Sequence, residues 1–222
     1  MAKAKRRTSA AGDETRAKIL DATLATLKDE GIVGTSARAI ARAGDFNQAL
    51  IFYHFGSVDE AIVAAVELMS ERRIERHRAQ LESAGTLRDL VDIARALHHD
   101  DSRNDSMTVL TQAFAGAAGD PVLGPKLYAS LVQWSDMVTA SIRRVLGESP
   151  LTNLVPADQI GQGISALFLG IELMADLDPD HAEVDHLFDT LTAAASVFEL
   201  LVAGQLSTIT RSEPERPNTS GV

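Results

Sequence analysis

Apolar residues recur at spacings of three and four along most of this chain, with polar residues on the faces between them. That period is typical of amphipathic α-helices, and no segment alternates as a half-buried strand does. The pattern and its breaks predict an all-α fold of about nine helices. The expected ranges are 13–30, 36–43, 47–54, 57–83, 85–100, 102–118, 121–146, 157–177 and 181–203.

Two of the expected helix starts carry clear capping signals. Ser57 is followed three residues later by Glu60, which is the spacing of a capping box. Asp120 precedes Pro121, an order that suits a cap followed by the first helical position. The long helix that begins near Ser57 is expected to connect an N-terminal unit to the rest of the chain.

The two short helices at 36–43 and 47–54 have the layout of a helix-turn-helix. Hydroxyls at Thr35 and Ser36 can cap the first helix, and Gly44 can adopt the left-handed conformation that ends it. Phe46 is expected to anchor the turn, and Asn47 to cap the second helix. In a helix-turn-helix the second helix enters the DNA major groove, and the alternative is an ordinary helical hairpin with core aromatics.

Within that second helix, Ile51 and Phe55 lie four residues apart and are expected to face inward. The other faces carry polar, aromatic and small side chains that are available for DNA, namely Gln48, Ala49, Leu50, Phe52, Tyr53 and His54.

Charge is distributed unevenly along the chain, whose net charge is −10. Residues 1–56 carry nine Lys/Arg and six Asp/Glu, a net of +3, whereas the remainder carries 12 and 25, a net of −13. The N-terminal part is therefore the part that can approach phosphate. Residues 1–12 are rich in Lys and Arg and are predicted to be a basic, disordered arm, and the polar tail at 207–222 is also predicted to be disordered.

Composition excludes several classes of protein. The chain has no cysteine, so it can form neither disulfides nor cysteine metal sites. We find no signal peptide, no phosphate-cradling glycine loop and no run near the roughly 18 apolar residues of a membrane span. His98 and His99 diverge on a helix, so the cluster at 98–101 is a weak metal candidate. We predict a cytoplasmic protein that is not an enzyme and needs no cofactor and no metal.

Residues 51–60 read Ile-Phe-Tyr-His-Phe-Gly-Ser-Val-Asp-Glu. This run resembles the signature of the tetracycline-repressor (TetR) family, which usually has Leu-Tyr-x-His-Phe-x-Ser-Lys-x-x-Leu. The preceding helix is similar to the family in Arg16, Ile19, Leu20, Ala22, Leu24, Leu27 and Gly31. The match covers about residues 13–70. It implies a three-helix DNA-binding domain at 13–60 and a helical effector-binding and dimerisation domain at 61–206.

The resemblance also implies which residues meet DNA. They are Thr35, Ser36, Arg38, Asn47, Gln48, Ala49, Leu50, Phe52, Tyr53, His54 and Ser57. In this alignment Gln48 can pair with adenine and Leu50 can touch a thymine methyl group. The chain departs from the family at Phe52, where Tyr is usual, at Val58, where Lys is usual, and at Asp45, which lies in a turn one residue longer than usual. These departures predict weaker contacts with the phosphate backbone.

The last two long helices carry broad apolar surfaces, which can serve a monomer core or a dimer. The resemblance favours a four-helix bundle with a second copy, with small residues such as Gly161, Gly163 and Gly170 allowing close approach. The expected interface comprises Ile160, Ile164, Leu167, Ile171, Leu187, Leu191, Ala194, Phe198 and Leu201. A two-fold dimer predicts a pseudo-palindromic operator.

The middle helices mix polar, aromatic and apolar residues, which can form either plain core or the lining of a ligand pocket. The family resemblance favours a pocket formed by His98, Met107, Leu110, Thr111, Phe114, Tyr128, Leu131, Trp134, Met137, Phe168 and Glu172. Few Lys or Arg are candidates for burial there, so a neutral or cationic, largely apolar effector is expected.

Together these features predict a homodimeric, sequence-specific transcriptional regulator of double-stranded DNA, released from its operator by a small molecule. Repression is the habit of the family rather than a property of the residues. The alternative is a helical adaptor that binds protein and has lost specific DNA binding.

Overall fold

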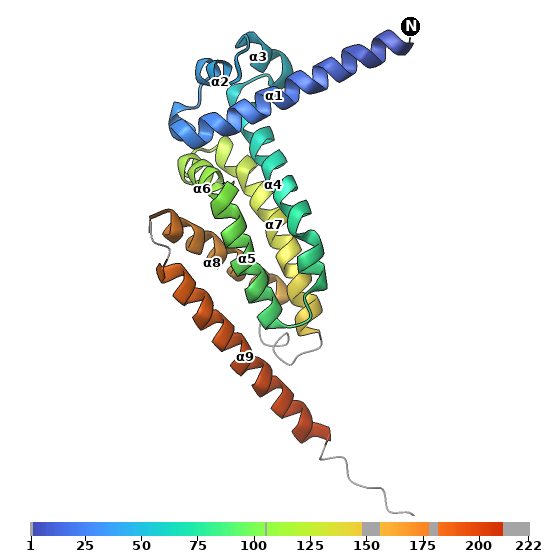
Figure 1. Cartoon of the computed structure of the whole chain (residues 1–222), viewed down its shortest axis with the longest axis vertical. Helices are drawn as coiled ribbons and strands as arrows, with labels where there is room; N and C mark the ends of the chain where they lie inside the picture. Colours follow the sequence, from blue (N-terminus) through green and yellow to red (C-terminus); the bar gives the residue numbers. More distant parts are fainter. Residues whose placement is uncertain (1, 105, 148–155, 178–181, 211–222) are drawn as a thin grey trace, which may run out of the picture.

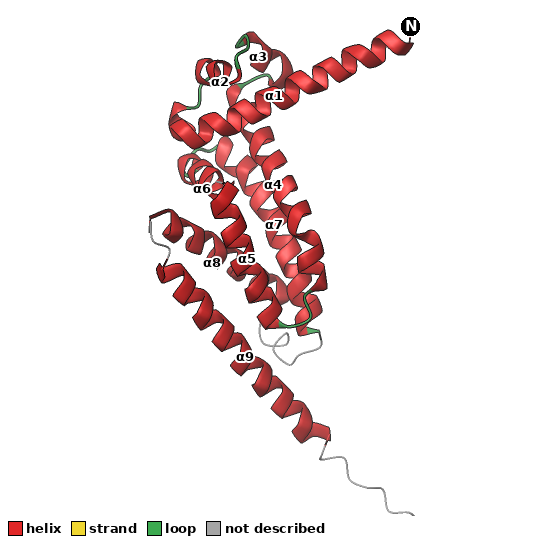
Figure 2. Cartoon of the chain, in the orientation of Figure 1, coloured by secondary structure: helices red, strands yellow, loops and turns green. Residues whose placement is uncertain are grey.

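The computed structural model describes residues 2–104, 106–147, 156–177 and 182–210. Within those ranges the chain forms helices and loops and no strand, as Figure 2 shows. The helices are α1 (Ala2–Gly34), α2 (Ala37–Gly44), α3 (Ala49–Phe55), α4 (Val58–Ser83), α5 (Leu87–Asn104), α6 (Ser106–Ala117), α7 (Leu123–Leu146), α8 (Ala157–Leu177) and α9 (Ala182–Thr210). The predicted all-α class is confirmed.

Two ends of the chain differ from expectation. Residues 2–12, predicted to be disordered, form the first turns of α1, which projects away from the body (Figure 1). Residues 207–210, predicted to belong to a disordered tail, are the last turn of α9. The rest of that tail, residues 211–222, lies outside the described residues.

The capping signals are found where the sequence places them. Ser57 Oγ accepts a hydrogen bond from the Glu60 amide at 3.1 Å, at the start of α4. Asp120 Oδ1 accepts from the amides of Val122 and Leu123, both at 2.8 Å, and α7 begins at Leu123, two residues later than expected. Each cap satisfies amides that have no partner inside the helix.

The helices form a small N-terminal head and a larger body (Figure 1). In the head, α1, α2 and α3 close around a cluster that includes Ile19, Ile40 and Ile51, all wholly buried. In the body, α4 packs against α7, α7 packs against α8, and α9 packs against α5. The body contains two apolar clusters, one against the head and one at its far end around Trp134, Phe168 and Phe188.

Helix α4 belongs to both parts. It begins beside α3 and runs for 26 residues, about 39 Å at 1.5 Å per residue, into the far end of the body. One face of it follows helical spacing from the head to the far end through Ile62, Val66, Arg73, His77 and Leu81, all buried. Helix α4 therefore connects the head to the far end of the body.

Candidate functional site

The turn between α2 and α3 differs in detail from the prediction. Ser36 caps α2 as expected, since its Oγ accepts from the Ala39 amide at 3.2 Å. The left-handed residue is Asp45, with φ of 50°, and not Gly44. Asp is among the residue types that tolerate this conformation, because its short polar side chain can bond locally.

Gly44 is needed for space. A Cβ at this position would lie 2.2 Å from Phe46 Cε1 and 2.9 Å from Ala22 Cβ. The missing side chain lets the Phe46 ring lie against α1, where it packs on the apolar cluster of the head. The anchoring role predicted for Phe46 is confirmed.

Helix α3 presents one face to the core and another to solvent. Ile51 is wholly buried and Phe55 is half-buried against the same cluster, as predicted. Asn47 Oδ1 accepts from the Ala49 amide at 2.8 Å, so Asn47 caps this helix. Tyr53 is 82% exposed, and its ring meets that of His54 edge to face at 5.0 Å. A rigid helix thus displays an aromatic and polar face.

Most of the residues expected to meet DNA lie at the surface. Exposed are Ser36, Arg38, Asn47, Gln48, Ala49, Phe52 and Tyr53, and half-buried are Leu50, His54 and Ser57. Leu50 packs against the head cluster, so only part of it faces solvent. Thr35 is the exception: it is only 7% exposed, and its hydroxyl donates to the Gly31 carbonyl at 2.7 Å. Thr35 holds the end of α1 and does not face outward.

Basic residues outside the predicted set of DNA contacts also surround the head. Lys18 Nζ donates to the Asp45 carbonyl at 3.5 Å, which places a positive charge beside the acidic turn. Arg16 lies over the Phe55 ring, 4.3 Å from its centre. Arg42 forms an ion pair with Glu30 at 2.5 Å, so its charge is partly committed to joining α2 to α1.

Two close contacts lie where the head packs on the body. Gly116 on α6 faces Ile32, and a Cβ on Gly116 would lie 2.0 Å from Ile32 Cγ2. Lys126 on α7 bonds Glu60 in the first turn of α4. These contacts fix how α1 and α4 are oriented on the body.

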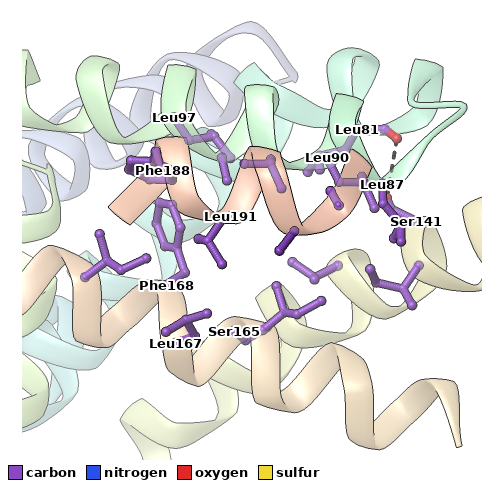
Figure 3. Close-up of a pocket in the computed structure, with 18 of the residues that line it drawn as sticks. Leu81, Leu87, Leu90, Leu97, Ser141, Ser165, Leu167, Phe168, Phe188 and Leu191 are labelled. Atoms are coloured by element: carbon purple, nitrogen blue, oxygen red, sulfur yellow. Dashed lines mark hydrogen bonds between the residues drawn. The ribbon is translucent and has the colours of Figure 1, made fainter. Parts of the chain in front are cut away.

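A large apolar cavity, of about 420 Å³, occupies the far end of the body (Figure 3). Its lining comes from the end of α4 and from α5, α7, α8 and α9. The residues are Leu81, Leu87, Leu90, Val91, Ala94, Leu97, Trp134, Val138, Ser141, Ile142, Ile164, Ser165, Leu167, Phe168, Ile171, Phe188, Leu191, Ala194, Ala195 and Phe198. The two hydroxyls are already engaged, since Ser141 donates to Met137 at 3.2 Å and Ser165 to Gly161 at 2.9 Å.

The residues predicted to form a pocket are divided between several places. Only Trp134 and Phe168 line the large cavity. These two, with Met107, Leu110, Phe114 and Leu131, line a smaller cavity beside it. Tyr128 is 60% exposed, Thr111 donates to Asp176 at 2.8 Å, and Met137 packs half-buried against the core. The prediction missed the residues of α5 and α9 that line the large cavity, because their apolar pattern is the same as that of ordinary core residues.

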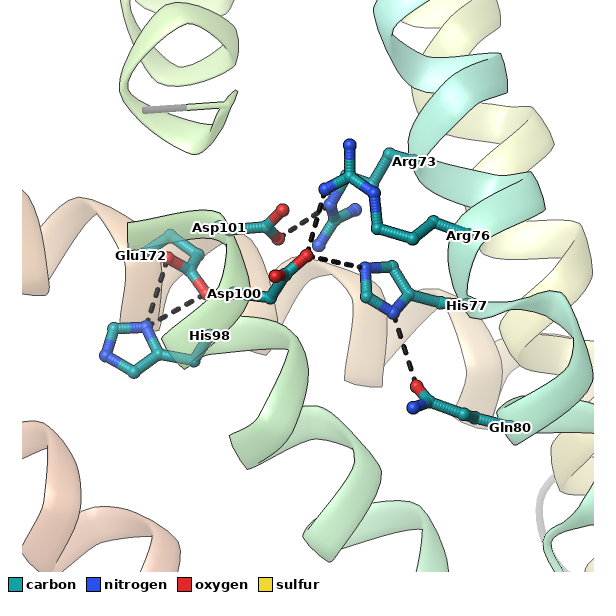
Figure 4. A network of polar contacts seen from close by, with 8 residues as sticks. All are labelled: Arg73, Arg76, His77, Gln80, His98, Asp100, Asp101 and Glu172. Carbon is teal, nitrogen blue, oxygen red and sulfur yellow. Dashed lines mark hydrogen bonds and ion pairs between the residues drawn. The ribbon is translucent and has the colours of Figure 1, made fainter. Parts of the chain in front are cut away.

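His98 and Glu172 are buried and bonded to each other. His98 Nδ1 lies 3.1 Å from Glu172 Oε1, and the two side chains join α5 to α8 (Figure 4). The hydrogen bond that His98 donates to the Glu172 carboxylate raises the pKa of His98, and burial raises the pKa of Glu172. Neither residue lines either cavity, so both serve this pair rather than the predicted pocket.

A second polar network joins α4 to α5 (Figure 4). Arg73 Nε donates to Asp101 at 2.7 Å and Arg76 donates to Asp100 at 2.9 Å. His77, Asp100 and Asp101 have ligand atoms within 4.8 Å of one another, a spacing compatible with a metal ion. Because two guanidinium groups already neutralise the two carboxylates, this cluster is better described as an ion-pair network.

An apolar stripe on α8 faces solvent. It follows helical spacing through Leu167, Met174 and Leu177, with Gly163 and Gly170 in the same row and open space around both glycines. Val197 and Leu200 on α9 are also exposed. The sequence prediction did not include Leu173, Met174, Leu177, Val197 or Leu200.

Several residues expected at the interface pack inside the chain instead. Ile171 is buried, and Ile160, Leu187 and Leu191 are half-buried in the same cluster. Ile164 and Leu167 are partly exposed, and Ala194 and Phe198 line the cavity. Gly161 touches Thr139 on α7, so its small size serves the chain's own packing. The side chain of Leu201 lies outside the described residues.

Helix α8 is more apolar than expected, since sequence analysis found no segment near the length of an apolar membrane span. Among the described helices it alone is long and apolar enough, by length and composition, to cross a membrane, and a third of its 18-residue apolar window is buried. The cause is visible in its two faces. One face is in the core with Phe168 and Ile171, and the other carries the exposed stripe.

Comparison with known proteins agrees with this geometry. Residues 19–60 match the family model described as bacterial regulatory proteins, tetR family. No curated protein sequence matches the chain.

Solved structures share the fold over most of the chain. A putative transcriptional regulator from Pseudomonas aeruginosa PAO1 is 21% identical, with a TM-score of 0.65 over 86% of this chain and 92% of that one. A putative TetR-family regulator from Rhodococcus sp. is 18% identical, with a TM-score of 0.69 over 83% and 98%. The multidrug binding protein EbrR, complexed with malachite green, is 21% identical, with a TM-score of 0.58 over 80% and 96%.

Proposed function

We propose that this tetR-family protein is a homodimeric repressor that binds a pseudo-palindromic operator and leaves it when a small, largely apolar ligand enters the body. The match of residues 19–60 to the family model and the shared fold support a DNA-binding transcriptional regulator. The observation that carries the proposal is that one continuous helix, α4, joins the exposed recognition face of α3 to the large cavity. It is expected to act on DNA in the cytoplasm.

We propose a role for individual exposed residues of α2 and α3. Gln48, Ala49 and Tyr53 are exposed on or beside α3 and are proposed to read base edges. Ser36 and Arg38 at the start of α2 are proposed to hold phosphate, which positions the head without selecting sequence. Lys18 lies beside the Asp45 turn and supports this arrangement by offsetting its charge.

The exposed stripe on α8 supports the proposed dimer. Contiguous apolar surface on a soluble protein often marks an interface, and Gly163 and Gly170 leave room for a close neighbour. A second copy packed by two-fold symmetry presents two recognition helices roughly 34–36 Å apart, which is one turn of DNA.

The cavity supports the proposed ligand response. Its volume of about 420 Å³ lies in the range of small-molecule sites, and its lining is almost entirely apolar. EbrR, which shares the fold, binds malachite green. Leu81 near the end of α4 forms part of the cavity wall, so a ligand can shift α4 and with it the head. A coupling of roughly 1–3 kcal/mol would lower operator affinity about 5- to 150-fold.

Selection of bound sequences from a random pool of double-stranded DNA tests the proposal. The purified protein is used at a stated salt concentration, because contacts with phosphate depend steeply on salt. We expect an enriched pseudo-palindrome with half-sites one helical turn apart. Replacing Tyr53 by Ala should abolish enrichment, whereas Tyr128→Ala should not, because Tyr128 is an exposed tyrosine on the body. A folded protein that enriches no sequence contradicts the proposal and favours the adaptor alternative.

A further inference from the structure

A second, much smaller cavity adjoins the large one. Its volume is about 30 Å³, and it shares Trp134, Ser165 and Phe168 with the wall of the large cavity. The Trp134 and Phe168 rings lie 6.2 Å apart between the two spaces. The small cavity has room for about one water-sized group, so it can accept the end of a ligand but not its body.

The wall of the small cavity contains two polar groups without a partner. Arg73 and Ser130 are only 4% and 3% exposed. Throughout the described part of the chain, neither Arg73 Nη2 nor Ser130 Oγ has a hydrogen-bond partner. Unpaired buried donors are costly, and both residues line this cavity. The cavity is thus suited to a group that carries a hydrogen-bond acceptor.

The guanidinium of Arg73 is held in place. Its Nε is bonded to Asp101 at 2.7 Å, and its Cζ lies 4.0 Å from the centre of the Trp134 ring and 5.3 Å from that of Phe168. These contacts fix its orientation and leave Nη2 as the free donor. Sequence analysis did not single out Arg73, although it lies on the same helical face as Val66 and His77.

The charge of Arg73 is already balanced. Asp101 is wholly buried, and the pair forms a compensated unit. A ligand carboxylate would add an unmatched negative charge to a buried site, which costs more than a neutral oxygen does. A carbonyl oxygen accepts hydrogen bonds from both donors and adds no charge.

We infer that the small cavity binds an uncharged carbonyl oxygen at one end of an otherwise apolar ligand, whose body fills the large cavity. Arg73 Nη2 and Ser130 Oγ donate to that oxygen, and Trp134 and Phe168 flank the group that joins it to the apolar body. This inference rests on the proposed ligand response and specifies the chemical class of the ligand.

Three compounds of similar size test the inference: 4-phenyl-2-butanone, butylbenzene and 4-phenylbutanoate. Trp134 is the chain's single tryptophan and lines both cavities, so its fluorescence reports binding directly. We expect the ketone to bind about 5- to 150-fold more tightly than butylbenzene, the factor for two net hydrogen bonds, and more tightly than the carboxylate. Equal affinity for ketone and hydrocarbon, or tightest binding of the carboxylate, would overturn the inference.

Two serine variants locate the polar end. Ser130→Ala should lower the ratio of ketone to butylbenzene affinity by at least about twofold, because one donor is lost. Ser196→Ala is the matched control, since Ser196 lines neither cavity and its hydroxyl already donates to the Thr192 carbonyl. An unchanged ratio in Ser130→Ala, in a variant that still melts cooperatively, would contradict the assignment.

The two proposals fail in different experiments. If no compound binds while the protein still selects a DNA palindrome, the ligand inference is overturned and the DNA-binding function stands. If the ketone preference is found but no DNA sequence is selected, the proposed operator binding fails and the ligand assignment stands.

Discussion

Gly116 lies where the head meets the body, and replacing it by Ala should disturb that joint. A Cβ there would lie 2.0 Å from Ile32 Cγ2 and 2.8 Å from Ile32 Cβ. Ile32 is β-branched and therefore stiff about its first side-chain torsion, so it cannot simply turn away. The last turn of α1 has to move.

The magnitude follows from two opposing terms. Overpacking a close contact typically costs about 1–3 kcal/mol. Replacing Gly by Ala inside a helix stabilises the folded state by roughly 1 kcal/mol, because Ala has the higher helix propensity. We therefore expect Gly116→Ala to lower the free energy of unfolding by about 0–2 kcal/mol, and to weaken operator binding because the head is displaced on the body.

Two measurements check this prediction: denaturant unfolding, and titration of the selected operator at fixed salt. The double variant Ile32→Ala/Gly116→Ala is the control, because it removes the Cγ2 atom that clashes. The double variant should lose less unfolding free energy than the two single variants lose together, as expected for residues in contact. A Gly116→Ala protein that is more stable than the wild type and binds the operator unchanged would refute the close packing at this joint.

Three further predictions concern the head, the buried pair and the α8 stripe. Ser36→Ala removes the cap of α2 and should lower the free energy of unfolding by about 1 kcal/mol, measured by denaturant unfolding. The hydrogen bond to Glu172 raises the folded-state pKa of His98. Protonated His98 therefore stabilises the fold fully below pH 6.5, and this contribution is lost as the pH rises through the folded-state pKa of His98. His98→Gln should therefore flatten the fall in melting temperature above pH 6.5. Met174→Glu places two like charges in the proposed interface and should weaken the dimer by about 100-fold in sedimentation equilibrium.

Controls for these predictions come from neighbouring exposed residues. His99→Gln should keep the pH dependence, because His99 is half-exposed and lies outside the pair with Glu172. Val122→Glu should leave the dimer intact, because Val122 is exposed at the start of α7, away from the stripe. A dimer equally sensitive to both glutamates would contradict an interface on α8.

The recognition helix illustrates what local sequence can specify. Asn47, Ile51 and Tyr53 have the conformations and exposures that their spacing predicts, because capping and helical periodicity are properties of a few adjacent residues. The same holds for the caps at Ser36, Ser57 and Asp120. The resemblance to the family rests on these local features, and the match to residues 19–60 covers the same segment.

Other features depend on contacts between residues far apart in the chain. Gly44 is required by Phe46 and Ala22, and Thr35 is buried because α1 and α2 close over it. Local pattern assigned Gly44 a backbone role, and the family resemblance placed Thr35 on DNA. Neither source contains information about which side chains approach from another helix.

The sequence by itself determined the helices, their caps, the charge asymmetry and the exposed face of α3 that is proposed to read DNA, because each depends on neighbouring residues and helical period. Only the tertiary structure decided the position of the large cavity, the burial of Arg73 and the division of α8 into a core face and an exposed stripe. These depend on how α4, α5, α7, α8 and α9 pack, and an apolar residue has the same pattern whether it fills a core, lines a cavity or faces a partner.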